Sequence, residues 1–202
     1  MNEIGSVLTF EQVEYELLEN NIVADRKIQK FMIWLNVAAI LMFVILTLAT
    51  FMLGFRAPLE GDFNLFTILI VLLAFLVFIV VHELLHGISF AIFGKVKGKN
   101  IKFGIVLKSG LAYCISQVPV KVSASRLSLM MPVYAVCLPM YIYGLVSQNV
   151  IIAIVSLLFF TGSIGDLYYM WKLRKTDKNL YMYEMPPSVK GYDIGYLLLK
   201  KI

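Results

Sequence analysis

Residues 63–93 read FNLFTILIVLLAFLVFIVVHELLHGISFAIF, an apolar stretch with a single polar interruption near its end. This length exceeds the roughly 20 residues that an α-helix needs to cross a bilayer. The interruption is His82-Glu83-Leu84-Leu85-His86, which contains both histidines of the chain. Ionisable groups inside a membrane helix are costly unless they serve a purpose. The stretch therefore predicts a membrane-spanning helix that carries residues of a functional site.

The two histidines are four residues apart, which fixes their relation on a helix. Four residues correspond to a rotation of about 400° and a rise of about 6 Å, so both imidazoles leave the same face. This arrangement suits two nitrogen ligands on one zinc ion, with Glu83 placed as the catalytic base. The alternative is a pair of buried or interfacial histidines without a metal.

A catalytic zinc site normally has three protein ligands, and the chain has no third histidine. Asp166, in Gly162-Ser163-Ile164-Gly165-Asp166, is the one carboxylate besides Glu83 inside a predicted span. We therefore predict His82, His86 and Asp166 as the metal ligands. Cys114 is the other candidate for the third ligand, and a salt bridge to Lys172 is the alternative role for Asp166.

The predicted depth of the two helices supports Asp166. His86 lies roughly 10 Å before the end of its helix near Phe93, and Asp166 lies roughly 8 Å before the end near Trp171. Both helices run in the same direction, so the side chains are expected at one level. Small residues, including Gly87 and Gly165, are expected to let the two backbones pack closely.

Composition predicts an all-α polytopic membrane protein, because 60% of the 202 residues are hydrophobic. Two cysteines give no disulfide framework. Four apolar runs are each long enough to span a bilayer. They are expected at Phe31 to Phe55, Phe63 to Phe93, Leu127 to Val146 and Val150 to Trp171.

Basic residues between the spans predict their orientation. The net charge of +5 is assigned to the positive-inside rule and not to binding of nucleic acid. Four spans with both termini in the cytoplasm place every basic cluster on that side, which predicts a multi-pass protein of the cell membrane. The clusters are Arg26, Lys27 and Lys30; Lys95, Lys97, Lys99, Lys102, Lys108, Lys121 and Arg126; and Lys172, Arg174, Lys175 and Lys178.

The polar segments divide the chain into three parts. Residues 1–30 are predicted as a cytoplasmic N-terminal segment with an amphipathic helix from Thr9 to Lys30, since Thr9 and Gln12 resemble a capping box. Residues 31–175 form the membrane core, and residues 176–202 a cytoplasmic tail. Apolar residues alternate on both sides of Ser109-Gly110, which predicts a small β-hairpin at about 99–122 between spans two and three. Its edge is a candidate for holding a peptide by strand addition, and the alternative is a hairpin without substrate contact.

A membrane-embedded HExxH helix, a cytoplasmic hairpin and a later Gly-Asp span resemble the site-2 protease class of intramembrane zinc metalloproteases. The chain is most similar to a family of small bacterial membrane zincin peptidases of unknown substrate. The resemblance extends from about Phe63 to Trp171. It implies that His82, His86 and Asp166 bind Zn²⁺ and that Glu83 is the catalytic base. Asp166 departs from the site-2 pattern, because Leu167 and not glycine follows it.

These observations predict a zinc-dependent intramembrane endopeptidase that cuts a membrane protein or peptide near the cytoplasmic face. The alternative is a non-catalytic membrane module, held together by zinc, in which Cys114 completes a closed four-ligand site. A zinc transporter is disfavoured, because the predicted spans contain no further histidines or carboxylates for a transfer path. Candidates for the oxyanion donor are Asn100, Ser89, Tyr113 and the hairpin amides. Tyr168 and Tyr169 are candidates for hydrogen bonds to the metal-ligand side chains.

Overall fold

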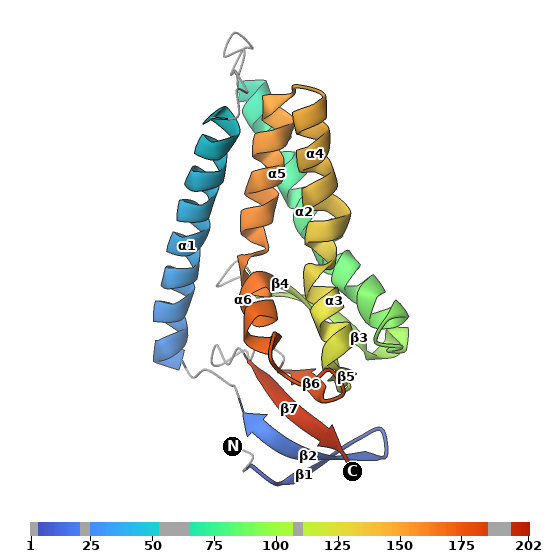
Figure 1. Ribbon diagram of the computed structural model, residues 1–202. Coiled ribbons are helices and arrows are strands. Elements are labelled where there is room, and N and C mark those ends of the chain that lie inside the picture. Colours follow the sequence, from blue (N-terminus) through green and yellow to red (C-terminus); the bar gives the residue numbers. More distant parts are fainter. Residues whose placement is uncertain (1–3, 21–24, 53–64, 107–110, 186–194) are drawn as a thin grey trace.

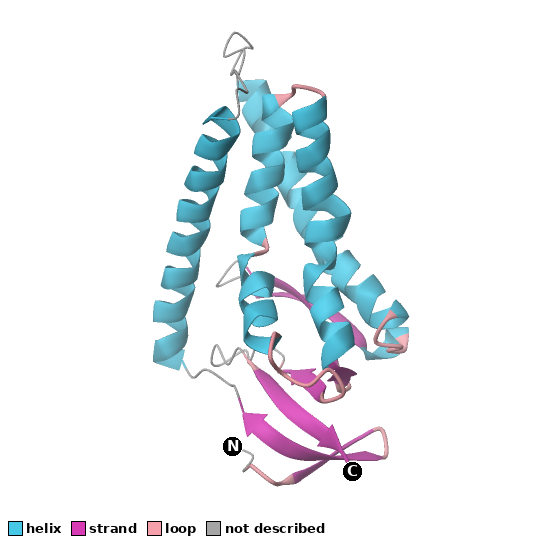
Figure 2. Cartoon of the chain, in the orientation of Figure 1, coloured by secondary structure: helices cyan, strands magenta, loops and turns pink. Residues whose placement is uncertain are grey.

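The computed structural model describes residues 4–20, 25–52, 65–106, 111–185 and 195–202, and it combines helices with two antiparallel sheets (Figures 1 and 2). Long helices stand side by side, and the larger sheet lies at one end of them beside both chain termini (Figure 1). The helices are α1 (Asp25–Met52), α2 (Leu65–Ile92), α3 (Val122–Pro132), α4 (Leu138–Val146), α5 (Val150–Gly162) and α6 (Ile164–Leu173). A 3₁₀ turn at Gly98–Asn100 follows α2, and a π-helical turn at Val133–Cys137 joins α3 to α4.

The prediction of an all-α protein with four spans is wrong. Among the described residues, two helical stretches are long and apolar enough to cross a membrane, Leu69–Ile92 and Val122–Val146. Helices α5 and α6 are bent by 53° at their junction, and they make a third crossing only if the bent pair counts as one. The described apolar part of α1, Asn36–Met52, is shorter. Apolar runs alone did not reveal these breaks, because hydropathy is insensitive to backbone direction.

The amphipathic helix predicted from Thr9 to Lys30 is also wrong. This segment begins with two paired strands, β1 (Val7–Phe10) and β2 (Val13–Asn20), and α1 starts only at Asp25. Glu11 and Gln12 make the turn with φ of 45° and 67°, a left-handed conformation that fits a tight hairpin. Apolar residues in β2 alternate with glutamates, which gives one buried and one solvated face.

The larger sheet brings the two ends of the chain together. Its five strands follow the order β1-β2-β7-β6-β5, in which β5 is Val120–Lys121, β6 is Tyr181–Glu184 and β7 is Tyr196–Lys201. Every pairing is antiparallel, and Leu17 of β2 lies opposite Leu199 of β7. The tail predicted at 176–202 therefore contributes two strands to this sheet.

The predicted hairpin between the second and third apolar runs is confirmed. Strands β3 (Ile101–Val106) and β4 (Leu111–Ser116) are antiparallel, with Phe103 opposite Cys114. The turn predicted at Ser109-Gly110 lies outside the described residues. The hairpin packs on α2 at Gly87, where an added Cβ would lie 2.6 Å from the Phe103 ring. Gly87 thus permits close packing of the hairpin, whereas Gly165 has nothing within 4 Å of such an atom.

Candidate metal centre

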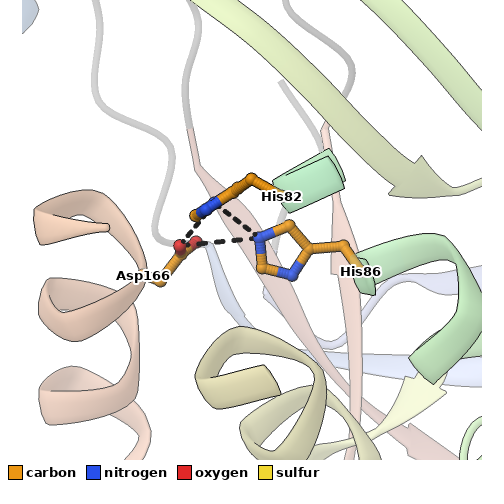
Figure 3. A group of neighbouring side chains, drawn as sticks. All are labelled: His82, His86 and Asp166. Atoms are coloured by element: carbon orange, nitrogen blue, oxygen red, sulfur yellow. Dashed lines mark hydrogen bonds and ion pairs between the residues drawn. The ribbon is translucent and has the colours of Figure 1, made fainter. Parts of the chain in front are cut away.

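The histidines of α2 point from one face of the helix into the interior of the molecule. His82 and His86 are 8% and 6% exposed, and their Nε2 atoms are 3.1 Å apart (Figure 3). The ring of His82 also contacts Phe78, which in turn stacks on Phe159 of α5. Apolar packing on this side fixes the position of the His82 ring and shields it from water.

Asp166 reaches the histidines from α6, a helix distant in sequence. Its Oδ2 atom lies 3.0 Å from His82 Nε2 and 3.5 Å from His86 Nε2 (Figure 3). The helix is interrupted at Ser163, between α5 and α6, so Asp166 lies in the first turn of a new helix. The positive end of the helix dipole favours a carboxylate there. The bend therefore both aims this side chain and stabilises its charge.

The three donor atoms fit a zinc ion. Two atoms bound to a tetrahedral zinc at 2.0–2.1 Å are about 3.3 Å apart, and the separations here are 3.0, 3.1 and 3.5 Å. Two imidazoles and one carboxylate are a donor set typical of catalytic zinc sites. Among the described residues, this trio is the group of histidine, cysteine and acidic side chains able to hold a metal. The structure thus brings together the three residues predicted as ligands.

The outer nitrogens of the two rings have different surroundings. His86 Nδ1 lies 3.0 Å from the Ser128 carbonyl oxygen on α3. A carbonyl only accepts, so Nδ1 carries a proton, and in the neutral ring Nε2 is then the nitrogen with a lone pair for a metal. His82 Nδ1 is buried and has no hydrogen-bond partner among the described residues. The sequence analysis did not find the Ser128 contact.

Glu83 lies between the two histidines along α2, and its side chain is half-buried. Its carboxylate accepts a hydrogen bond from the backbone N–H of Cys114 in β4. The hairpin therefore holds the carboxylate beside the donor cluster. This position is compatible with the predicted role of Glu83 as a base.

Cys114 contributes its backbone to the site and its thiol to the packing. The side chain is buried against α2 and does not belong to the donor cluster. Burial, with the Glu83 and Glu184 carboxylates adding to its effect, raises the pKa of the Cys114 thiol to about 12. The position of the Cys114 side chain outside the donor cluster argues against it as a third or fourth ligand.

Other predicted candidates have different partners. The Asn100 side chain donates to Glu11 in the β1–β2 turn, 3.0 Å away. Lys172 lies over the Tyr168 ring, whereas the Asp166 carboxylate contacts the Nε2 atoms of the two histidines. Tyr169 packs against Tyr196 of β7. Ser89 is buried and its hydroxyl has no partner among the described residues.

Glu184 is a third carboxylate near the site, and it is not among the residues predicted from the sequence. It ends β6, and its charge interacts with His86, Asp166 and Glu83. Burial raises the pKa of this carboxyl to about 7, and repulsion by the Asp166 and Glu83 carboxylates adds to the effect. Residues 186–194, which follow it, lie outside the described part of the chain. Nothing in the local sequence signals that the sheet carries this group to the site.

Comparison with known families gives a match over half of the chain. The family model described as "Putative zincin peptidase" matches residues 75–181, which include α2 from Phe75 onwards, the hairpin, α3 to α6 and the start of β6. No curated protein and no solved structure matches the chain. The matched segment contains all three donor residues and Glu83.

Proposed function

The chain belongs to the family described as "Putative zincin peptidase", and on that premise we propose that it is a zinc-dependent endopeptidase that cuts a membrane-associated polypeptide. The convergence of His82, His86 and Asp166 on one point carries this proposal. Glu83 stands on the same helix turn, where an HExxH protease has its base. Two helices long and apolar enough to cross a membrane support the membrane setting.

His82, His86 and Asp166 would hold the metal. A bound zinc ion would polarise the scissile carbonyl and lower the pKa of a water molecule towards neutrality. Glu83 takes the proton from the attacking water and delivers it to the leaving amine. The Cys114 N–H orients the Glu83 carboxylate for both transfers. Phe78 and Phe159 keep bulk water away from the His82 side of the cluster.

The substrate segment is proposed to lie extended along β4. In the two-stranded sheet this strand pairs with β3, and its Cys114 N–H points to Glu83. A peptide added beside β4 would place its backbone next to the base and the donor cluster. We further propose a cell-membrane location with both termini and the five-stranded sheet in the cytoplasm, because the basic clusters then obey the positive-inside rule.

The test compares zinc content and cleavage in detergent-purified protein prepared without chelator. The wild type should contain about one zinc per chain, and Asp166→Ala should lose it. Glu83→Gln should retain zinc, while cleavage of single-span reporter polypeptides in proteoliposomes falls by at least about 100-fold. Mass spectrometry of the products gives the cut position. A zinc-free wild type, or unchanged cleavage by Glu83→Gln, would overturn the proposal.

A further inference from the structure

The Ser128 carbonyl on α3 makes a contact that a helical carbonyl does not ordinarily make. It accepts the Nδ1 proton of His86 at 3.0 Å, and the Ser128 hydroxyl donates back to the His86 carbonyl at 3.3 Å. Both residues are buried. Helices α2 and α3 are thus joined by a reciprocal pair of hydrogen bonds at a predicted metal ligand.

Within an α-helix, the carbonyl of Ser128 would accept the backbone N–H of residue 132. That residue is Pro132, which has no N–H to donate and is fully buried inside the helix. The next amide, Val133 N–H, donates to the Met130 carbonyl instead. The chain then widens into the π-helical turn Val133–Cys137, in which Leu138 N–H donates to Val133. The Val133 and Leu138 amides therefore do not compete with His86 for the Ser128 oxygen.

We propose that Pro132 is a positioning residue for the metal centre. It leaves the Ser128 carbonyl free, this carbonyl holds the proton of His86 on Nδ1, and the Nε2 lone pair therefore faces His82 and Asp166. The proline acts through the tautomer of a ligand and touches no donor atom of the cluster. The inference rests on the proposed function, since it assigns a purpose to the break in the helix at that same site.

The proposal explains two features of α3 together. A proline inside a helix ordinarily destabilises it, and the freed carbonyl would lack a partner in a buried setting. The imidazole N–H satisfies that carbonyl, and the carbonyl in turn orients the imidazole. Outer contacts of this kind typically change metal affinity by 10–100-fold.

The first experiment reads the tautomer directly. Because the chain has two histidines, labelling with ¹⁵N-histidine gives two imidazole spin systems. In chelator-treated protein, at a pH where both rings are neutral, His86 of the wild type should be protonated on Nδ1. In Pro132→Ala the restored amide recaptures the Ser128 carbonyl, so His86 should show a mixture of both tautomers. A wild-type His86 protonated on Nε2 would overturn the proposal even if Pro132→Ala does not fold.

The second experiment measures zinc affinity by competition with a chelator. Pro132→Ala should bind zinc about 10–100-fold more weakly than the wild type. The matched control is Pro139→Ala in the same broken helix, which should retain wild-type affinity because Pro139 is exposed and lies beyond the π-helical turn. Equal affinities and tautomers in both variants would overturn the inference while leaving the zinc site intact. A wild type without zinc would overturn the proposed function instead.

Discussion

The five-stranded sheet and the long helices bury their apolar side chains to different degrees. Leu17 and Leu199 face each other in the sheet and are completely buried, whereas Leu76 and Val80 of α2 are each 60% exposed. The sheet therefore buries one set of apolar side chains between its own strands and another against α3 and α6, whereas α2 presents an apolar surface that requires another apolar medium. The donor cluster lies on the inward face of α2, close to where α3 and α6 pack against the sheet. One region thus buries its apolar side chains, and the other leaves them exposed along helices long and apolar enough to cross a membrane.

The largest expected difference between the two regions comes from identical leucine substitutions. Leu199→Ala removes a fully buried side chain and should destabilise the sheet by about 2–5 kcal/mol. Leu76→Ala, on the exposed face of α2, should change the unfolding free energy in detergent by less than about 0.5 kcal/mol. Hydrogen exchange followed by mass spectrometry would locate the loss of protection in β2 and β7. Equal destabilisation by the two variants would contradict the division into two regions.

Glu184 gives a second test of the comparison between the sheet and the helices, because the sheet places this carboxylate near the donor cluster of the helices. Burial holds its pKa at about 7 in the folded protein, against 4.5 for an ordinary glutamate. The folded state therefore binds more protons than the unfolded chain between these values, and the unfolding free energy should fall as pH rises from about 4.5 to about 7. The unfolding free energy can fall by at most about 3 kcal/mol over this range, because one pKa unit corresponds to about 1.36 kcal/mol.

Glu184→Gln removes the titrating group and should make the pH dependence less steep over that window. The measurement is urea unfolding of chelator-treated protein at several pH values, with wild type and variant compared at each. Subtracting the two curves isolates Glu184 from other groups that titrate in the same range. Parallel curves would show that Glu184 is not the source of the slope.

The two histidines could be predicted as neighbours because their spacing on one helix is local, and Asp166 because it is the one other carboxylate in a predicted span. Four-residue spacing on a helix decides that His82 and His86 share a face, and helix rise decides that Asp166 lies at their depth. The structure brings these three donors together. The Ser128 contact was in principle accessible, since a proline four residues later in a helix always leaves a carbonyl without its usual partner.

The sheet escaped prediction because its pairings join distant parts of the chain. Val13, Tyr15 and Leu17 alternate with polar residues, a strand pattern. The resemblance of Thr9 and Gln12 to a capping box and the glutamates of this segment favour a helix instead. The turn also lacks the usual glycine, and Glu11 and Gln12 adopt positive φ in its place. Residues 13–20 pair with the neighbouring residues 7–10 and, on their other side, with residues 196–201 at the far end of the chain. No local feature of either segment indicates that pairing.

A smaller effect is expected from two glycines that flank predicted ligands, Gly87 after His86 and Gly165 before Asp166. A Cβ at Gly87 would lie 2.6 Å from the Phe103 ring and 3.4 Å from Cys114 Sγ, whereas a Cβ at Gly165 would meet nothing within 4 Å. Both Gly→Ala changes gain helix propensity, so their difference isolates the clash with the hairpin. Phe103 is 49% exposed and can yield, which limits the cost at Gly87 to about 1–2 kcal/mol.

The expected functional result of Gly87→Ala is lower cleavage with zinc retained. Displacing the hairpin moves the Cys114 N–H away from Glu83, while His82, His86 and Asp166 keep their places on α2 and α6. Gly165→Ala should keep both cleavage and zinc content, and the single-span reporter assay with parallel metal analysis distinguishes these cases. If Gly87→Ala loses zinc as well, the hairpin supports the donor cluster itself. If it loses neither, the contact between β4 and Glu83 does not contribute to the reaction.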